Sequence, residues 1–412
     1  MKFVLTTIGS AGDVFPMIGL AIKLKERGHE VLLATNSHFA SLAERQGIPF
    51  EPLGSSEEYL KCIQSPDLWH PQKAFKHVFH FFQPILKRQY EVIAEQAAAG
   101  PVVGISSCLC FGARIAQETL GIPVLTVHLQ PAVIWSDLKP PVVPGLVGPR
   151  WLKSLIFRIG EKFAVDGVVC PFLNAWRREL NLPPISRVTR WWNSPSGVLC
   201  LFPEWFATPQ ADWPGPLIQT DFPLWNDQSE EVLAPEVEQF LVSGSPPIAF
   251  TPGSANVHGR GFFETALQAC QALNRRAIFL TRHWEQLPSS LPNTAQAVSY
   301  APLDRLLPRC AAFVHHGGVG STSQAFLAGI PQIAMPLAHD QFDNAARIHA
   351  LNAGRGLPEK HFKVPALVTL LKELLDSKEV FSACQKLRER LASRSGLHES
   401  VSAIEQRFCQ DS

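Results

Sequence analysis

Residues 313–341, FVHHGGVGSTSQAFLAGIPQIAMPLAHDQ, decide the fold of this chain. An apolar run ends in two histidines, and a glycine-rich turn, a helix-forming segment and a second apolar run follow. This order predicts a strand, a turn, a helix and a strand. Glycines let backbone N–H groups approach a ligand, and a helix N-terminus favours anions. His316 adds a side-chain donor, so the turn predicts a diphosphate site that needs no metal. Its other predicted members are Gly317, Gly318, Gly320, Ser321 and Thr322.

The composition is that of a globular chain with room for two domains. Its 412 residues are 46% hydrophobic and 18% charged, which is enough to build two cores of about 200 residues each. A formal net charge of +1 gives no reason to expect a nucleic-acid partner. The nine cysteines form no C-x-x-C motif and lie mostly in apolar contexts, so we expect reduced, buried thiols in a cytosolic protein.

The amino-terminal residues 1–24 are apolar but do not resemble a signal peptide. Ser10, Gly12, Asp13 and Pro16 interrupt the apolar run. No uncharged apolar run reaches the roughly 18–20 residues that a membrane span needs. We therefore predict a cytoplasmic protein, and peripheral contact with the inner membrane stays open.

Strand and helix patterns alternate in both halves, which predicts two doubly wound α/β domains with parallel sheets. The N-terminal strand candidates are 2–9, 29–36, 102–107 and 122–127, with helices at 16–27 and 113–120. The C-terminal strand candidates are 247–253, 277–281, 297–301, 312–316 and 332–336, with helices at 261–273, 321–328 and 341–351.

A segment rich in proline and tryptophan, residues 202–227, separates the halves. We predict an N-terminal domain at 1–220, a C-terminal domain at 221–380, and helices at 381–412 that cross back to the N-terminal domain. Open α/β sheets bind ligands at the carboxyl ends of their strands, so two such edges are expected to face each other across a cleft.

These segments resemble the family 1 glycosyltransferases with the two-domain GT-B fold, in their sterol- and glycopeptide-type bacterial branch. TIGSAGDVFP (7–16) and HHGGVGST (315–322), with Asp340-Gln341 downstream, carry the resemblance. A nearer similarity is to the bacterial rhamnosyltransferases of rhamnolipid synthesis, through segments such as 194–214 and 338–347, and it extends over nearly the full length.

The resemblance implies an inverting sugar transfer from a nucleotide diphosphate. Such a displacement needs a base for the acceptor proton and stabilisation of the departing diphosphate. The family places the base at Asp13, whose position also permits simple helix capping. His316 matches the family's phosphate-contacting histidine and is the second catalytic candidate.

The remaining donor-site candidates surround the glycine-rich turn. The family's pattern assigns phosphate or sugar contacts to Gly253 and Ser254 and sugar recognition to Asp340 and Gln341, although Asp340 could also cap a helix. Tyr300 stands where plant members stack a tryptophan on the base, and its neighbour Ala301 is a further donor-site candidate. Leu303 and Gln324 replace a Gln and a ribose-binding Glu, which weakens the expectation of uridine and leaves room for thymidine. No Asp-x-Asp occurs, so we expect no metal and no cofactor beyond the nucleotide sugar itself.

The N-terminal domain is expected to bind the acceptor. The acceptor-site candidates are Ser10, Phe15, His128 and Trp135, although a satisfied core histidine is the plainer interpretation of His128. The apolar, aromatic segments 74–86, 128–135 and 148–163 suit a lipophilic acceptor. Residues 148–163 also mix basic and apolar side chains, so they could pack over the acceptor pocket or lie on an anionic membrane surface.

The leading hypothesis is transfer of rhamnose from dTDP-rhamnose to a hydroxyacyl lipid. The alternative is a UDP-glucose-dependent enzyme acting on a sterol, polyketide or flavonoid-like aglycone. A non-catalytic relative of the same fold would be expected to lose Asp13, His316 or the Asp340-Gln341 pair, and all are present. A dinucleotide-dependent oxidoreductase is disfavoured because neither half shows G-x-G-x-x-G after its first strand.

Overall fold

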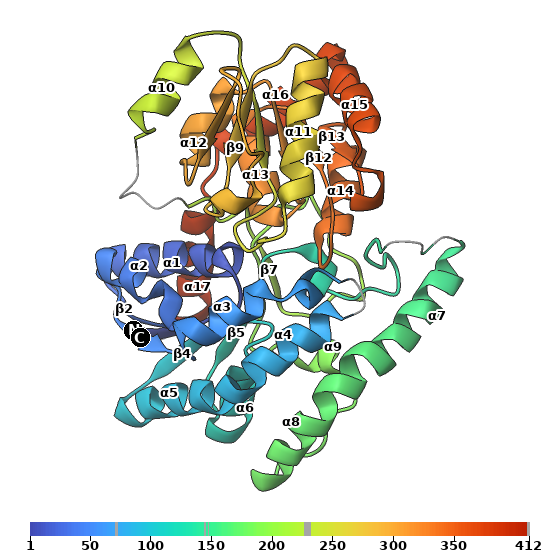
Figure 1. The fold of residues 1–412 in the computed structure, drawn as a ribbon. Helices are drawn as coiled ribbons and strands as arrows, with labels where there is room; N and C mark the ends of the chain where they lie inside the picture. The colour runs from blue at the N-terminus through green and yellow to red at the C-terminus, as the bar shows by residue number, and fades with distance from the viewer. Residues whose placement is uncertain (71–72, 144–145, 147, 226–231, 410–412) are drawn as a thin grey trace. The chain divides into compact units, whose positions relative to one another are not determined.

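The computed structural model describes residues 1–412 apart from 71–72, 144–145, 147, 226–231 and 410–412 (Figure 1). The chain divides into two compact units. Unit 1 comprises Met1–Pro223 with Ser395–Ser412, and unit 2 comprises Leu224–Arg394. The predicted domain boundaries were residues 220 and 380. The first agrees within a few residues, and the second lies at residue 394, later than predicted.

Unit 1 is built on a seven-stranded parallel sheet of order β3-β2-β1-β4-β5-β6-β7. Its central strands are nearly continuous apolar runs, because helices cover both faces of a doubly wound sheet. Phe3, Val4 and Leu5 of β1, for example, are all fully buried. The strands are β1 (Lys2–Thr6), β2 (Glu30–Thr35), β3 (Phe50–Pro52), β4 (Val102–Ser107), β5 (Val124–His128), β6 (Val198–Cys200) and β7 (Leu217–Gln219).

The helices of unit 1 connect these strands and include one from the C-terminus. They are α1 (Ala11–Glu26), α2 (Ala40–Arg45), α3 (Ser56–Gln64), α4 (Ala74–Phe82), α5 (Leu86–Ala99), α6 (Phe111–Leu120), α7 (Arg150–Gly160), α8 (Gly167–Glu179), α9 (Val188–Trp191) and α17 (Gly396–Phe408). A π-helical turn at Glu161–Asp166 joins α7 to α8.

Unit 2 repeats the architecture with a six-stranded parallel sheet of order β10-β9-β8-β11-β12-β13. Its strands are β8 (Ile248–Thr251), β9 (Ala277–Leu280), β10 (Ala295–Val298), β11 (Ala312–His315), β12 (Gln332–Ala334) and β13 (Gly354–Gly356). Its helices are α10 (Pro235–Val242), α11 (Arg260–Ala272), α12 (Leu303–Leu306), α13 (Val319–Ala328), α14 (Gln341–Ala350), α15 (Val364–Asp376) and α16 (Lys378–Ala392).

The two doubly wound parallel sheets confirm the predicted fold class. Every predicted strand is present, with ends that differ by a few residues. The prediction for 297–301 was too late, because β10 ends at Val298 and leaves Tyr300 and Ala301 in the following connection.

The strand order of each unit changes direction between two neighbouring strands. In unit 1 these are β1 and β4, and in unit 2 they are β8 and β11. The connections that leave such a pair run to opposite faces of the sheet, and the crevice between them is where open α/β sheets bind ligands. The turn before Asp13 follows β1, and Gly253 and His316 follow β8 and β11, so the fold places these predicted residues at the two reversal points.

The last two helices of the chain belong to different units. α16 packs against α13 of unit 2, whereas α17 packs against α1 of unit 1. The hydroxyls of Thr220 and Ser400 form a buried hydrogen bond of 2.8 Å, and His29 Nε2 lies 3.0 Å from Glu405 Oε1. The predicted return of the C-terminus to unit 1 is therefore made by α17 alone.

Candidate functional site

The imidazole of His316 lies between two glycines from different loops. Thr251 of β8 pairs with His315 of β11 in parallel register, so the loops after these strands start side by side. A β-carbon at Gly253 would lie 2.9 Å from Nδ1 of His316, and one at Gly318 would lie 2.4 Å from Nε2. Gly253 also has a φ of +98°, which disfavours other residues. Both glycines are thus required for the ring to occupy this place.

His316 is neutral near pH 7 in this environment. Burial, followed by the nearby His339, lowers its pKa to about 4. Nδ1 is buried without a hydrogen-bond partner among the described residues. A neutral imidazole still has one N–H to donate, and an arriving diphosphate would raise its pKa. The predicted phosphate contact is therefore chemically available as a hydrogen bond rather than as a resident positive charge.

His315 has a structural task that the sequence did not reveal. It is fully buried, its Nδ1 accepts the N–H of Gly317 at 3.0 Å, and its Nε2 lies 2.9 Å from Oε1 of Gln332. Since Nδ1 accepts, Nε2 carries the proton and donates to Gln332. Burial, with His316 nearby, lowers the pKa of His315 to about 3. This neutral ring fixes the start of the glycine-rich turn, where Gly317 has a φ of +89°.

The N-terminus of α13 offers unpaired backbone donors beside His316. Gly318 is the N-cap, and its carbonyl accepts both the N–H and the hydroxyl of Thr322, each at 3.0 Å. The first three residues of α13, Val319, Gly320 and Ser321, have no partners for their N–H groups within the helix. Thr322 is buried and closes the turn, while Gly320 and Ser321 remain accessible. The arrangement is that of an anion-binding helix start.

Asp340 and Gln341 stand at the start of α14, where Gln341 bonds to the backbone of the preceding loop and Asp340 bonds to a side chain of the helix. Gln341 is buried, and its Oε1 accepts the N–H groups of Leu337 and Ala338 at 2.7 and 3.1 Å. Its carbonyl oxygen therefore fixes the loop, and only its amide nitrogen remains for a sugar. The carboxylate of Asp340 accepts a 2.6 Å bond from Asn344.

Asn344 is a residue that the sequence analysis missed. Its Nδ2 also donates to the carbonyl of Gly317 at 2.9 Å, which ties α14 to the glycine-rich turn. Its Oδ1 is buried without a partner among the residues that the structure describes. The only signal in the sequence was its position one helical turn after Asp340, on the same face of α14.

The other predicted donor residues of unit 2 differ in accessibility. Ser254 is exposed directly after Gly253, and Tyr300 is partly exposed with the guanidinium of Arg282 5.9 Å from its ring centroid. Ala301 is buried in the hydrophobic core with Leu306 and Phe313, so its side chain is not available for a donor contact.

Asp13 in unit 1 is a helix-capping carboxylate with a perturbed pKa. It is the third residue of α1, and its Oδ2 accepts the N–H and the hydroxyl of Ser10 at 2.9 and 3.3 Å. A β-carbon at Gly9 would lie 2.2 Å from Oδ2. Burial raises the pKa of Asp13 to about 6, against the lowering effect of the Ser10 bonds. Capping and proton abstraction are compatible, because both bonds use Oδ2 and a pKa near 6 suits a general base at neutral pH.

His128 is buried at the end of β5 and hydrogen-bonded. Its Nε2 lies 2.7 Å from Oδ1 of Asn193, whose Nδ2 donates to the carbonyls of Thr189 and Arg190. Asn193 thus presents an acceptor, and His128 Nε2 must carry the proton. Burial lowers the pKa of His128 to about 4. The plainer interpretation, a neutral core histidine, therefore accounts for its Nε2, while Nδ1 is buried without a partner among the described residues.

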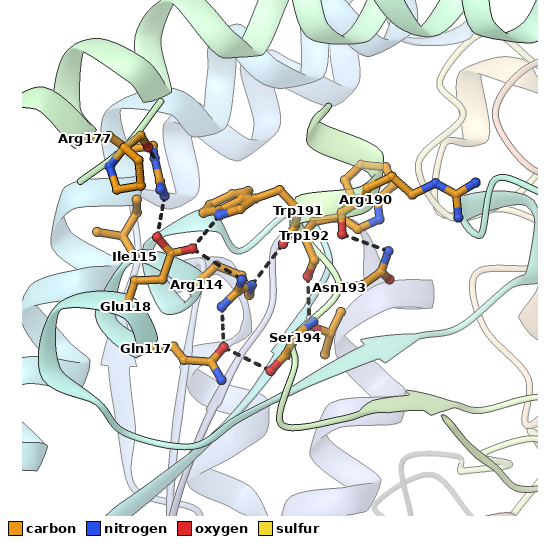
Figure 2. A network of polar contacts seen from close by, with 12 residues as sticks. Arg114, Ile115, Gln117, Glu118, Arg177, Arg190, Trp191, Trp192, Asn193 and Ser194 are labelled. Carbon is orange, nitrogen blue, oxygen red and sulfur yellow. Dashed lines mark hydrogen bonds and ion pairs between the residues drawn. The ribbon is translucent and has the colours of Figure 1, made fainter. Parts of the chain in front are cut away.

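A polar network fixes the segment that carries Asn193 (Figure 2). Glu118 of α6 forms an ion pair with Arg177, whose Nη1 lies 2.7 Å from Oε2, and accepts a 2.6 Å hydrogen bond from Trp191 Nε1. Ser194 donates its hydroxyl to Gln117 at 2.9 Å. These bonds hold residues 189–194 against α6 and α8, and so they hold the partner of His128.

The remaining three acceptor candidates also lie in unit 1. Ser10 is engaged with Asp13, and Phe15 follows on α1 with a partly exposed side chain. Trp135 packs edge-on against Phe157 of α7, with ring centroids 5.3 Å apart. Each predicted set of residues is thus placed within its own unit, and the expectation that the two sets face each other stays a prediction.

No group of three or more metal-ligating side chains occurs in the described part of the chain. Among the described residues no helix is long and apolar enough to cross a membrane.

Comparisons with known proteins agree with the fold of both units. Residues 3–134 match the glycosyltransferase family 28 N-terminal domain, and residues 266–406 match the C-terminal domain of erythromycin biosynthesis protein CIII-like proteins. The O-mycaminosyltylonolide 6-deoxyallosyltransferase of Streptomyces fradiae is 28% identical, with 98% of this chain and 97% of the relative covered. A sterol 3-beta-glucosyltransferase of Arabidopsis thaliana is 26% identical over 98% of this chain and 68% of its own length.

Solved structures give the same result. The glycosyltransferase of kitacinnamycin superimposes with a TM-score of 0.77 at 21% identity, covering 99% of each chain. The spinosyn rhamnosyltransferase SpnG in complex with thymidine diphosphate gives a TM-score of 0.70 at 18% identity, covering 98% of this chain and all of the other. The two sheets, the glycine-rich turn and these matches identify the chain as a glycosyltransferase with the GT-B fold.

Proposed function

We propose that this glycosyltransferase moves rhamnose from dTDP-rhamnose to a hydroxyl of a lipophilic acceptor, with inversion at the anomeric carbon. The observation that carries the donor assignment is the imidazole of His316 held between Gly253 and Gly318, next to the unpaired amides of α13. Hydrogen-bond donors arranged in this way are complementary to the oxygens of a departing diphosphate.

The proposed mechanism uses one residue to accept the proton and a set of donors to stabilise the leaving group. Asp13 takes the proton of the acceptor hydroxyl, whose oxygen attacks the anomeric carbon. The bond from that carbon to the diphosphate oxygen breaks, and the nucleotide diphosphate leaves with the electron pair. The charge that develops on it is met by His316 and by the first amides of α13, and Asp340 with the amide nitrogen of Gln341 orients the sugar.

The thymidine preference rests on the residues expected near the base and ribose. Leu303 packs against the core and gives no polar contact, and the buried Gln324 stands where a ribose-binding glutamate would carry charge. Support also comes from three structural neighbours that were solved with thymidine diphosphate, although their likeness is one of fold. The lipid acceptor is inferred from the apolar, aromatic segments of unit 1 and from the resemblance of the sequence to the rhamnosyltransferases of rhamnolipid synthesis, which stays a prediction.

A second candidate is glucosyl transfer from UDP-glucose to a sterol or a similar aglycone. The observation in its favour is the relationship to sterol glucosyltransferases of plants and yeast over 98% of this chain. The two candidates differ in the nucleotide, so a melting-temperature panel with thymidine and uridine diphosphates separates them. Stabilisation by thymidine diphosphate alone supports the proposal, whereas stabilisation by uridine diphosphate alone refutes the donor assignment.

Turnover tests the enzymatic role itself. Purified protein is incubated with dTDP-rhamnose and a hydroxyacyl lipid, or with UDP-glucose and a sterol, and released nucleotide diphosphate is measured. Release that depends on the acceptor is expected with the first pair. Nucleotide binding without release on any acceptor tested would favour the non-catalytic auxiliary role.

A further inference from the structure

Helix α7 exposes an unusual amount of apolar surface. Of the fourteen large hydrophobic side chains that are exposed in the described residues, eight lie between residues 138 and 163. Five of them belong to α7 and the turn after it, and none of the residues of α7 is buried. These five are Trp151 (68% exposed), Leu155 (48%), Ile156 (43%), Ile159 (49%) and Phe163 (70%). In Figure 1, α7 leads into α8 as a long helical arm of unit 1.

The side of α7 that faces unit 1 is held by polar contacts and by the packing of Phe157 against Trp135. Ser154 donates to the carbonyl of Asp137 at 2.9 Å, and Arg158 pairs with the carboxylate of Asp137 at 2.7 Å. One turn further on, the buried Glu161 pairs with Arg187 at 2.6 Å. In a helix, Trp151, Leu155 and Ile159 share one face, while Ser154 and Phe157 lie on the other side. Arg158, seven residues after Trp151, lies at the edge of the apolar face. The outward face of α7 is therefore largely apolar, whereas its inward side combines polar bonds with one aromatic contact.

The charges beside the apolar stripe are almost all positive. Arg150, Lys153 and Lys162 form no ion pair with any described residue, and Arg158 adds a fourth cation. Of the acidic groups nearby, Asp137 and Glu161 are each paired with an arginine, and Asp166 is buried and accepts the N–H of Val188. A basic cluster of this kind is a local feature, since the whole chain has a formal net charge of only +1.

We propose that α7 docks unit 1 on an anionic lipid membrane, lying in the plane of the surface. An exposed apolar stripe that carries a tryptophan and is flanked by lysines and arginines matches the headgroup region of such a bilayer. A second copy of the chain is a poorer occupant. A symmetric pairing of α7 with itself would bring basic residues against basic residues without unpaired carboxylates to balance them. A lipophilic acceptor bound to the apolar stripe of α7 would give no anionic partner to the lysines and arginines beside it.

Vesicle binding tests the proposal with the full chain. Sedimentation with vesicles of phosphatidylcholine alone is compared with vesicles that contain about one third phosphatidylglycerol. We expect binding to the anionic vesicles that weakens as salt is raised. Trp151→Ser with Phe163→Ser should weaken it about tenfold or more. Lys153→Gln with Lys162→Gln should weaken it about fivefold for each lysine, on anionic vesicles only.

The controls keep folding and oligomerisation apart from membrane binding. Trp284→Ser removes a side chain that is 57% exposed in unit 2 and should leave vesicle binding unchanged. Each variant is compared by its melting temperature and by nucleotide binding, which the proposed function assigns to unit 2. Absence of vesicle binding by the native chain, or equal binding by Trp151→Ser with Phe163→Ser, would overturn the proposal. So would a concentration-dependent dimer in sedimentation velocity that this double variant abolishes, because the stripe would then serve a second copy.

Discussion

Replacing Gly318 by alanine should damage donor binding through the position of His316. The backbone of Gly318 has φ −62° and ψ 147°, which alanine adopts without strain. Its β-carbon, however, would lie 2.4 Å from Nε2 of His316, about 1 Å inside the closest ordinary contact. The ring or the loop must therefore move by about 1 Å, which is enough to break a hydrogen bond to a phosphate.

The size of the effect follows from the bond that is lost. A hydrogen bond to a charged group contributes about 1.5–3 kcal/mol, so affinity for the nucleotide diphosphate should fall by about 10- to 150-fold. The assay is calorimetric titration with thymidine diphosphate. Gly261→Ala is the matched control, because it is the second residue of α11 and a β-carbon there meets no atom within 4 Å.

A double-mutant cycle decides whether the loss acts through the imidazole. If His316 is the group displaced, Gly318→Ala should cost little in a His316→Ala background, because the ring is already absent. Additive losses in the double variant, or an unchanged affinity in Gly318→Ala alone, would refute the reasoning.

Three further predictions concern the other residues of the site. Asp13→Asn should abolish transfer while nucleotide binding persists. In the native chain kcat/KM should decrease at pH values below about 6, because Asp13, with its raised pKa, becomes protonated there, and a flat profile down to pH 5 would contradict this assignment. Asn344→Leu should weaken nucleotide binding by about 1–3 kcal/mol through loss of its bond to Gly317, measured by titration, whereas Arg347→Leu, one turn away on α14, should have a smaller effect. Acid should destabilise unit 2, because the folded-state pKa of His315, about 3, lies below its unfolded value. Its contribution to stability is present at pH 7 and declines as pH falls below about 6.5, by about 2 kcal/mol at pH 5 in denaturant unfolding. The lowered pKa of His316 acts in the same direction, so His315→Gln should reduce the pH dependence of stability without removing it.

The architecture was readable from the sequence because its signals are local and repeated. Apolar runs bounded by glycine and polar turns predicted nine of the thirteen strands in the described residues, whereas the three-residue strands β3, β6, β7 and β13 were missed. The reversal of strand order follows from the fold class. What the sequence could not give was the partner of each polar side chain. Gln341 was predicted to recognise a sugar together with Asp340, but its amide oxygen is bonded to Leu337 and Ala338, so only the amide nitrogen remains for that contact. The domain change near residue 394 was also missed, because α16 and α17 have similar helical patterns and only packing separates them.

The two adjacent histidines show why neighbouring residues of one motif have different tasks. Successive side chains of a strand point to opposite faces, so His315 enters the core while His316 emerges beside the glycine loops. The imidazole of His315, the inner ring, bonds through one nitrogen to Gly317 and through the other to Gln332. It therefore fixes the turn that carries His316, the outer ring. The outer ring has no hydrogen bond to a described residue at its buried Nδ1, and it lies against Gly253, Gly318 and the ring of His315. An anion that binds at α13 therefore meets a donor already in place, and the conformational cost of ordering that donor has been met by folding.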